Sequence, residues 1–226
     1  MDRARRAGFR LYLITDRKVR ESRGLVEVCE AVLAAASAIA PPGTVALQLR
    51  EKDLGGRELY EFARRLREIC TRTGAMLLIN DRIDVAIASG ADGVHLPADS
   101  VGAFMARKLL GPERLIGVST HSRPDVVAAA RDGADFAVFG PVFDPISKSP
   151  GLPARGPDAL LDACRDCAIP VFALGGITPA RARELFARAG QSARPAGVAA
   201  IGSIFGADSP PDAIRSMLAA ISLRES

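Results

Sequence analysis

The sequence of 226 residues has no tryptophan and only two tyrosines, two histidines and four cysteines. Surfaces that bind single-stranded nucleic acid stack bases on aromatic rings, and this chain has few rings to offer. The formal charge of +4 is modest, and basic residues are scattered along helix-like segments such as residues 64–67 and 181–183. Solvated helix faces explain that distribution. We therefore expect no nucleic-acid partner.

Long apolar runs are also lacking. No stretch approaches the ~18 consecutive apolar residues with which a helix spans a membrane. The first segment, Met-Asp-Arg-Ala-Arg-Arg, is charged and leads directly into a short strand-like run. We expect a cytoplasmic protein with no membrane partner.

The four cysteines do not make a disulfide framework in a chain of this size. Cys164 and Cys167 have the spacing of a redox or zinc half-site, but no second pair or nearby histidine completes it. We interpret them as bystanders. The chain is 48% apolar and 25% charged and has no linker, so we expect a single domain over residues 1–226.

What the sequence does contain is a repeated unit. A short apolar or β-branched run is followed by a polar turn and then by a longer stretch of helical period that ends near a glycine. Several runs are continuously apolar, as parallel strands buried on both faces are. Strands are predicted at residues 11–15, 45–50, 76–80, 93–96, 115–119, 136–140, 171–174 and 198–202.

Helices are predicted between these strands, at residues 25–40, 56–73, 126–132, 180–189 and 211–221. About eight strands that alternate with helices are typical of a single (β/α)8 TIM barrel, a fold of the α/β class. The alternative is an open doubly wound sheet, which a glycine-rich fingerprint after the first strand would favour. Thr15-Asp16-Arg17 stands there instead. We therefore predict the barrel, with function at the carboxyl ends of its strands.

Amide and cationic side chains follow the second predicted strand. Gln48, Arg50 and Lys52 alternate along the chain, so an extended backbone would place them on one face. The ordinary alternative is a strand that ends in solvated charge. Because polar residues recur at later strand ends, we interpret these three as a fork that binds an anion.

Glycine turns follow the seventh and eighth predicted strands, at Gly175-Gly176 and at Ile201-Gly202-Ser203. A backbone without Cβ atoms approaches an anion closely, and the first N–H groups of the next helix have no partners within it. Each turn alone could be structural, but a pair at these two strands is the usual phosphate site of a barrel. We therefore expect phosphorylated small-molecule substrates.

Asn80 and Asp81 follow the third predicted strand, and Asp99 lies after the fourth. One alternative is that Asn80 and Asp81 cap the next helix, because both residue types accept first-turn hydrogen bonds. Magnesium takes one or two carboxylates together with waters and substrate phosphate oxygens. We predict that Asp81 is a Mg²⁺ ligand and that Asp99 is the second candidate.

Hydroxyl, imidazole and amine groups complete the strand-end side chains. Ser119 and His121 follow the fifth predicted strand, and Ser147 and Lys148 lie in a proline-, serine- and glycine-rich loop after the sixth. Long loops after barrel strands commonly carry ligand-binding groups. His121 either exchanges protons with a ligand or has a loop or capping role. His95 lies on an apolar strand and is expected to be a wall residue satisfied by a hydrogen bond.

These motifs, in this order, resemble the thiamine phosphate synthase and thiazole tautomerase superfamily. The resemblance runs from residue 11 to residue 204 and includes segments 47–52, 79–84, 91–96, 117–122, 139–143 and 175–178. In its synthase branch it implies an enzyme that joins hydroxymethylpyrimidine diphosphate to a thiazole phosphate, with Mg²⁺ as cofactor. The implied chemistry is dissociative, so stabilisation of the departing diphosphate matters more than a nucleophilic side chain.

The resemblance also implies roles by position. Contacts to the pyrimidine diphosphate are expected from Gln48, Arg50, Lys52, Asn80, Ser119, Ser147 and Lys148. The thiazole phosphate is expected at Gly175, Gly176, Ile201, Gly202 and Ser203. The expected catalytic residues are Lys148, Ser119 and His121, and the metal is expected at Asp81 and Asp99.

The chain departs from the synthase pattern at three places. Ser100 stands where an aspartate metal ligand is usual, the loop motif Pro145-Ile146-Ser147-Lys148 lacks its first threonine, and Gly202 replaces a common serine. The serine-containing turn after His95 resembles the tautomerase branch, in which the residue at His121 handles protons without a metal. The complete cationic fork and the Asn80-Asp81 pair favour the synthase.

A paralogue that binds thiamine precursors without turnover is a further alternative, motivated by Ser100. The sequence leaves the oligomeric state open and is compatible with a homo-oligomer.

Overall fold

The computed structural model describes residues 7–19, 24–144 and 153–222. Their strands form one closed, all-parallel barrel in the order β1 to β8, in which β8 pairs with β1. The strands are β1 (Leu11–Ile14), β2 (Val45–Leu49), β3 (Met76–Asn80), β4 (Gly93–Leu96), β5 (Leu115–Thr120), β6 (Phe136–Phe139), β7 (Val171–Ala173) and β8 (Gly197–Ala200). The predicted (β/α)8 barrel is confirmed.

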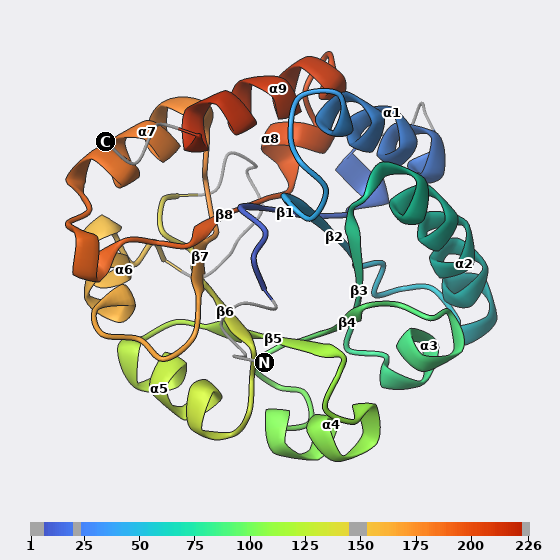
Figure 1. Cartoon of the computed structure of the whole chain (residues 1–226), viewed down its shortest axis with the longest axis horizontal. Helices are drawn as coiled ribbons and strands as arrows, with labels where there is room; N and C mark the ends of the chain where they lie inside the picture. Colours follow the sequence, from blue (N-terminus) through green and yellow to red (C-terminus); the bar gives the residue numbers. More distant parts are fainter. Residues whose placement is uncertain (1–6, 20–23, 145–152, 223–226) are drawn as a thin grey trace.

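Helices surround the barrel as an outer ring (Figure 1). They are α1 (Leu25–Ser37), α2 (Gly56–Thr73), α3 (Ile83–Ala88), α4 (Ala103–Leu110), α5 (Arg123–Arg131), α6 (Pro157–Cys164), α7 (Pro179–Arg188), α8 (Gly202–Phe205) and α9 (Pro210–Ile221). The described residues also include the short 3-10 turns η2 (Arg17–Val19), between β1 and α1, and η3 (Gln191–Ala193), between α7 and β8. None of the helices in the described part of the chain is long and apolar enough to cross a membrane.

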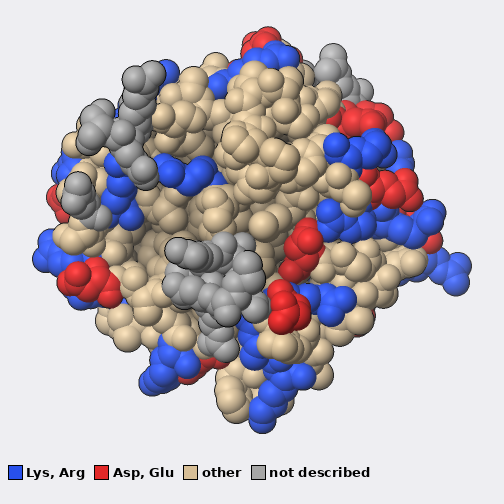
Figure 2. Space-filling model, in the orientation of Figure 1, with Lys and Arg blue, Asp and Glu red and all other residues tan. Residues whose placement is uncertain are grey.

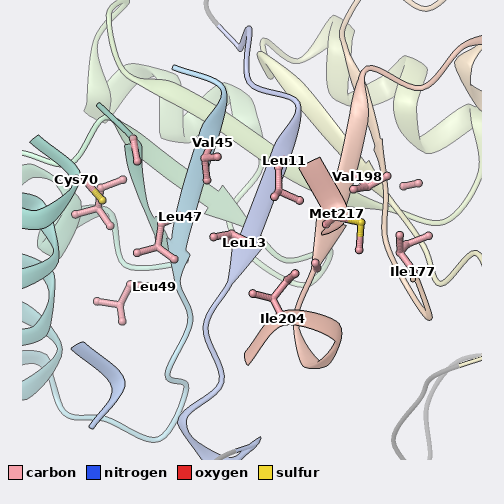
Figure 3. Close-up of a cluster of buried hydrophobic side chains, with 14 of the residues drawn as sticks. Leu11, Leu13, Val45, Leu47, Leu49, Cys70, Ile177, Val198, Ile204 and Met217 are labelled. Carbon is pink, nitrogen blue, oxygen red and sulfur yellow. The ribbon is translucent and has the colours of Figure 1, made fainter. Parts of the chain in front are cut away.

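The alternation of side chains along each strand separates two cores. Leu11, Leu13, Leu47 and Leu49 point outward and pack with helix residues such as Met217 (Figure 3). The intervening residues point into the barrel. Both faces of each strand are thus buried, which explains why the strand sequences are almost continuously apolar.

An aromatic cluster fills the barrel interior. Phe9, which precedes β1, stacks on Phe172 at a centroid distance of 4.5 Å and meets Phe136 edge-on at 5.2 Å. Tyr12 lies 5.5 Å from Phe136 and is completely buried. These rings occupy the amino end and the middle of the barrel, so space for polar side chains remains at the carboxyl ends of the strands.

Basic and acidic side chains are intermixed over α1 and α2 on the face that Figure 2 presents. Arg65 pairs with Glu27 at 3.1 Å and Arg72 pairs with Glu30 at 2.6 Å across these two helices. Arg65 and Arg72 of α2 are exposed, as predicted for a solvated helix face, and they pair with glutamates of α1.

Candidate active site

Four polar side chains from consecutive strands meet inside the carboxyl end of the barrel. Gln48 on β2 donates from Nε2 to Asn80 Oδ1 on β3 at 2.9 Å. His95 on β4 lies 2.9 Å through Nε2 from Ser119 Oγ on β5. Asn80 is paired with His95 in the strand register, so the two pairs adjoin. The structure thus brings together three predicted site residues, Gln48, Asn80 and Ser119, and adds His95.

Three buried polar atoms in this region have no hydrogen-bond partner among the described residues: Tyr12 Oη, Gln48 Oε1 and His95 Nδ1. Their side chains are at most 3% exposed. An unpaired polar atom that is buried costs roughly 1–3 kcal/mol, so such groups usually face a ligand or an ordered water. The cluster is therefore suited to a ligand that both donates and accepts hydrogen bonds.

His95 is held neutral by its surroundings. Burial, and to a smaller extent the positive charge of Arg50, together lower its pKa to about 3. Arg50 itself is half-buried and directly follows β2, at the carboxyl end of the barrel. His95 can donate or accept a hydrogen bond at neutral pH without introducing a charge.

The cationic fork is arranged differently from its prediction. Strand β2 ends at Leu49, and the chain turns at Lys52, so only Gln48 of the three fork residues lies on the strand. Arg50 is half-buried and Lys52 is exposed. The strand thus ends one residue before its predicted end, and Arg50 and Lys52 lie in the segment that follows it.

Glu51 is a buried carboxylate that ties the end of β2 to the end of β1. Its Oε1 accepts a hydrogen bond from Thr15 Oγ1 at 2.7 Å, and its carboxylate accepts the Arg17 N–H at 3.2 Å. Thr15 Oγ1 in turn accepts the Arg50 N–H at 2.9 Å. This network fixes the backbone from which the Arg50 side chain leaves. Neither Glu51 nor Thr15 was singled out from the sequence as a site residue.

Asp81 has a left-handed backbone with φ of 64°, which is unusual for a residue other than glycine. Its N–H donates to the His95 carbonyl at 2.9 Å, and its Oδ1 accepts a hydrogen bond from Ser100 Oγ. Helix α3 begins at Ile83 with Arg82 as N-cap and no side-chain cap, so Asn80 and Asp81 do not cap it. The Asp81 carboxylate is exposed and points to the loop after β4.

The second predicted metal residue, Asp99, is exposed in the turn just before Ser100. Among the described residues no group of three or more His, Cys, Asp or Glu side chains is placed to hold a metal ion. A bound cation would therefore take most of its ligands from water and from a phosphorylated substrate, as Mg²⁺ commonly does.

His121 lies in the loop between β5 and α5. Its Nδ1 is 2.5 Å from the Gly140 carbonyl, and its backbone N–H donates to Asp125 Oδ2 at 2.9 Å. Because a carbonyl oxygen only accepts, Nδ1 carries the proton and Nε2 is the nitrogen left for other contacts. His121 is thus anchored beside the end of β6.

The glycine turn after β7 has the expected special backbone. Gly175 and Gly176 have φ values of 102° and 60°, and Cβ atoms there would collide with Pro141 and with the Asp144 carbonyl. The turn leads into α7, where Thr178 caps the helix by accepting the Arg181 N–H at 3.2 Å. After β8, Ile201 precedes the single-turn helix α8, and Ser203 is half-buried within it.

Ser147 and Lys148 lie outside the described residues. The chain on either side is held to the barrel: Phe143 N–H donates to the Gly175 carbonyl at 3.1 Å, and Arg155 N–H donates to the Pro141 carbonyl at 2.8 Å. Among the described residues, Phe143 thus pairs with the glycine turn after β7 and Arg155 with the chain just after β6.

The closed barrel with polar and cationic side chains at its carboxyl end defines a (β/α)8-barrel enzyme. Residues 11–204 match the family described as thiamine monophosphate synthase. The chain belongs to this family, in agreement with the resemblance in its motifs.

Similar proteins carry the name of the synthase. The chain is 42% identical over 177 residues to the thiamine-phosphate synthase of Chlorobium luteolum, covering 78% of this chain and 81% of the relative. It is 47% identical over 211 residues, 93% of each chain, to a Geobacter sulfurreducens protein to which the same activity is provisionally assigned. The thiamine phosphate pyrophosphorylase structure from Pyrococcus furiosus has a TM-score of 0.80 at 30% identity and covers 96% of both chains.

Proposed function

We propose that the protein is a thiamine phosphate synthase. The chain belongs to this family, and one structural observation carries the proposal. Amide and imidazole side chains line the barrel interior, Arg50 follows the strand that bears Gln48, and a glycine turn follows β7. In the proposed reaction the bond between the pyrimidine methylene carbon and the diphosphate oxygen breaks. The thiazole nitrogen supplies the electron pair for the new carbon–nitrogen bond, diphosphate leaves, and no proton needs to be transferred.

The aminopyrimidine ring fits the unpaired interior atoms. Its amino group is a donor for Gln48 Oε1, and its ring nitrogens are acceptors for donors such as Tyr12 Oη–H. Asn80 holds the Gln48 amide by its hydrogen bond of 2.9 Å and thereby fixes which Gln48 atom faces the ring. Hydrogen bonds from the aminopyrimidine to Gln48 Oε1 and Tyr12 Oη would remove the cost of burying these two atoms without partners.

The neutral state of His95 suits a dissociative reaction. Positive charge develops on the pyrimidine methylene as diphosphate departs, and an imidazolium in the same low-dielectric interior would oppose it. Burial keeps the pKa of His95 near 3, so the ring stays uncharged at neutral pH. Its bond to Ser119 orients the hydroxyl that we assign to a diphosphate oxygen.

The leaving diphosphate requires positive charge. Arg50 directly follows β2 and carries a charge that lowers the pKa of His95, and Lys52 follows in the exposed turn. We assign both to the diphosphate, with Ser147 and Lys148 from the loop after β6 as the sequence-based candidates that complete the set. Donors fixed in place before the reaction stabilise a leaving anion without reorganisation.

Magnesium is the proposed cofactor, and the residues present are compatible with it. Asp81 offers one exposed carboxylate, which is within the one or two that Mg²⁺ takes when substrate phosphates supply other ligands. Asp99 is the second candidate, and Ser100 orients the Asp81 carboxylate by its hydrogen bond. When bound, the ion would neutralise charge on the departing diphosphate.

The thiazole phosphate is assigned to the two glycine turns after β7 and β8. Gly175 and Gly176 leave room for close approach, and the turn at Ile201, Gly202 and Ser203 offers backbone and hydroxyl donors. Under this assignment the two substrates bind to different strands of one barrel mouth, the pyrimidine diphosphate at β2 to β5 and the thiazole phosphate after β7 and β8. We propose that the enzyme works in the cytoplasm on these small molecules without a nucleic-acid partner.

A coupled assay tests the proposal. Purified protein with hydroxymethylpyrimidine diphosphate, thiazole phosphate and Mg²⁺ should form thiamine phosphate and diphosphate, and EDTA should abolish the product. Asp81→Asn should lose most of the activity, whereas Asp84→Asn, exposed on the adjoining helix, is the matched control. Absence of product from folded wild-type protein would contradict the proposal. Turnover of the carboxylated thiazole phosphate would then identify a tautomerase that uses His121, and binding of precursors alone would identify the non-catalytic paralogue.

A further inference from the structure

Arg181, in the first turn of α7, turns its side chain back onto the glycine turn that precedes the helix. Its Nη1 donates to the Gly176 carbonyl at 2.7 Å, and its guanidinium carbon lies 4.7 Å from the centroid of the Phe143 ring. The side chain is half-buried. A Cβ atom on Gly176 would lie 2.8 Å from Arg181 Nη1 and 2.9 Å from Phe143 Cβ, so the three residues are packed tightly.

The bond from Arg181 sets the direction of a peptide unit. The peptide group is planar and trans, so the Gly176 carbonyl and the Ile177 N–H point in opposite directions. With the carbonyl turned toward Arg181, the Ile177 N–H is turned away from it. The described residues offer no backbone acceptor to the N–H groups of Gly175, Gly176 or Ile177. Successive unpaired N–H groups of this kind form a concave site for an anion.

Arg181 also joins two loops. Phe143, on which the guanidinium stacks, donates its N–H to the Gly175 carbonyl at 3.1 Å, and Val142 N–H donates to the Leu174 carbonyl at 2.7 Å. The segment after β6 and the turn after β7 are therefore paired by their backbones and bridged by one side chain. A planar guanidinium is suited to this bridge because it donates in its plane and stacks on its face.

We propose that Arg181 is a positioning residue for a phosphate monoester, which it serves by holding the Gly175–Ile177 turn with its N–H groups toward the barrel mouth. Its positive charge lies behind the turn and adds attraction for a dianion without contacting it. The identity of the ester as the thiazole phosphate rests on the proposed function, whereas the role of Arg181 in phosphate binding does not.

Calorimetry of ligand binding tests the proposal apart from turnover. We expect Arg181→Ala to weaken binding of thiazole phosphate at least tenfold and to change binding of the unphosphorylated thiazole alcohol by less than twofold. Arg181→Lys, which keeps the charge but not the planar group, should recover only part of the affinity. Arg183→Ala is the matched control, because Arg183 is exposed on the same helix and its removal also deletes one positive charge.

Kinetics supply the second readout. Arg181→Ala should raise KM for thiazole phosphate while leaving kcat and KM for the pyrimidine diphosphate within twofold. The proposal is overturned if Arg181→Ala binds thiazole phosphate like Arg183→Ala, or if it weakens the phosphate and the alcohol equally. If Arg181→Ala does not fold, the same comparison is made with Arg181→Lys. Loss of phosphate binding in a protein without turnover would reject the proposed activity and leave the role of Arg181 intact.

Discussion

At the scale of single residues, His95 shows how position determines chemistry. Its ring is buried between Tyr12 and Phe136, with centroid distances of 5.7 Å and 6.0 Å. Burial lowers its pKa from 6.5 to about 3. A histidine whose folded pKa is lowered binds fewer protons in the folded state than in the unfolded state over the interval between these two values. The free energy of unfolding therefore falls as pH falls through that interval.

We expect wild-type protein to lose about 2 kcal/mol more stability than His95→Asn between pH 7 and pH 5, since each pKa unit corresponds to 1.36 kcal/mol. Urea unfolding at pH 7, 6 and 5 measures the difference. Above pH 7.5 the two pH profiles should run parallel, which is the internal control. Parallel profiles down to pH 5 would mean that the folded protein protonates His95 and that the ring is not held neutral.

Ser100 gives a second prediction at this scale. Its hydroxyl bonds to Asp81, so an aspartate at this position would place a second carboxylate beside the first. We expect Ser100→Asp to bind Mn²⁺, a probe for Mg²⁺, on the order of tenfold more tightly in the absence of diphosphate, since affinity for such ions rises with ligand charge. Electron paramagnetic resonance of free Mn²⁺ measures this directly.

Asp84→Asn, exposed on α3, is the control for the Ser100 experiment, and we expect it to leave Mn²⁺ affinity within twofold of wild type. Asp99→Asn tests the second candidate ligand in the same assay. An unchanged affinity in Ser100→Asp would remove residue 100 from the metal site. A large loss in Asp99→Asn would instead make Asp99 the principal partner of Asp81.

At the scale of elements, the ends of the strands decide the site, and Glu51 links two of them. Its carboxylate accepts hydrogen bonds from Thr15 and Arg17, and Thr15 accepts the Arg50 N–H. Glu51→Gln replaces one acceptor oxygen by a donor group that faces other donors. The backbone of Arg50 should then no longer be held in place through Thr15, while the Arg50 side chain keeps its charge.

We expect Glu51→Gln to raise KM for hydroxymethylpyrimidine diphosphate about five- to tenfold, corresponding to roughly 1–1.4 kcal/mol, the scale of a typical hydrogen bond. KM for the thiazole phosphate should change little, because the turns assigned to it follow β7 and β8, whereas Glu51 joins the ends of β1 and β2. Steady-state kinetics with each substrate varied separately test this. Glu58→Gln, exposed on α2, is the control, and equal effects of the two variants would show that Glu51 does not position Arg50.

The elements themselves were largely predictable because they depend on local patterns. All eight strands of the barrel occur within two residues of their predicted ends, and α2 has its predicted bounds. Periodicity and glycine positions carry this information along the chain. The prediction also placed Gln48, Asn80 and Ser119 at strand ends, where the structure has them.

The parts that the sequence did not reveal depend on contacts between distant segments. Thr15 and Glu51 are separated by 36 positions, and nothing near either residue indicates the other. Tyr12 looks like an ordinary strand residue until the barrel closes and places its hydroxyl among unpaired polar atoms. Arg181 resembles the exposed Arg183 in sequence, and only the path of the preceding turn distinguishes them.

At the scale of the whole molecule, the aromatic interior supports the site from below. Phe9 contacts Tyr12, Phe136 and Phe172, at centroid distances of 5.4, 5.2 and 4.5 Å, and Tyr12 in turn contacts His95 at 5.7 Å. One continuous cluster of rings thus connects the amino end of the barrel to the wall of the proposed pyrimidine site. Removing its lowest ring should weaken the barrel as a unit.

We expect Phe9→Ala to lower the free energy of unfolding by about 3–5 kcal/mol, because a large buried ring is replaced by a cavity that its neighbours fill only in part. Urea unfolding monitored by circular dichroism measures the change. An unchanged m-value would show that wild type and Phe9→Ala expose the same amount of surface on unfolding. Phe104→Ala is the matched control: its ring is 58% exposed on α4, whereas that of Phe9 is 1% exposed. We expect the control to change stability by less than about 0.5 kcal/mol. A Phe9→Ala protein as stable as the Phe104→Ala protein would mean that the segment before β1 adds little to the barrel and that the interior is held by the strands alone.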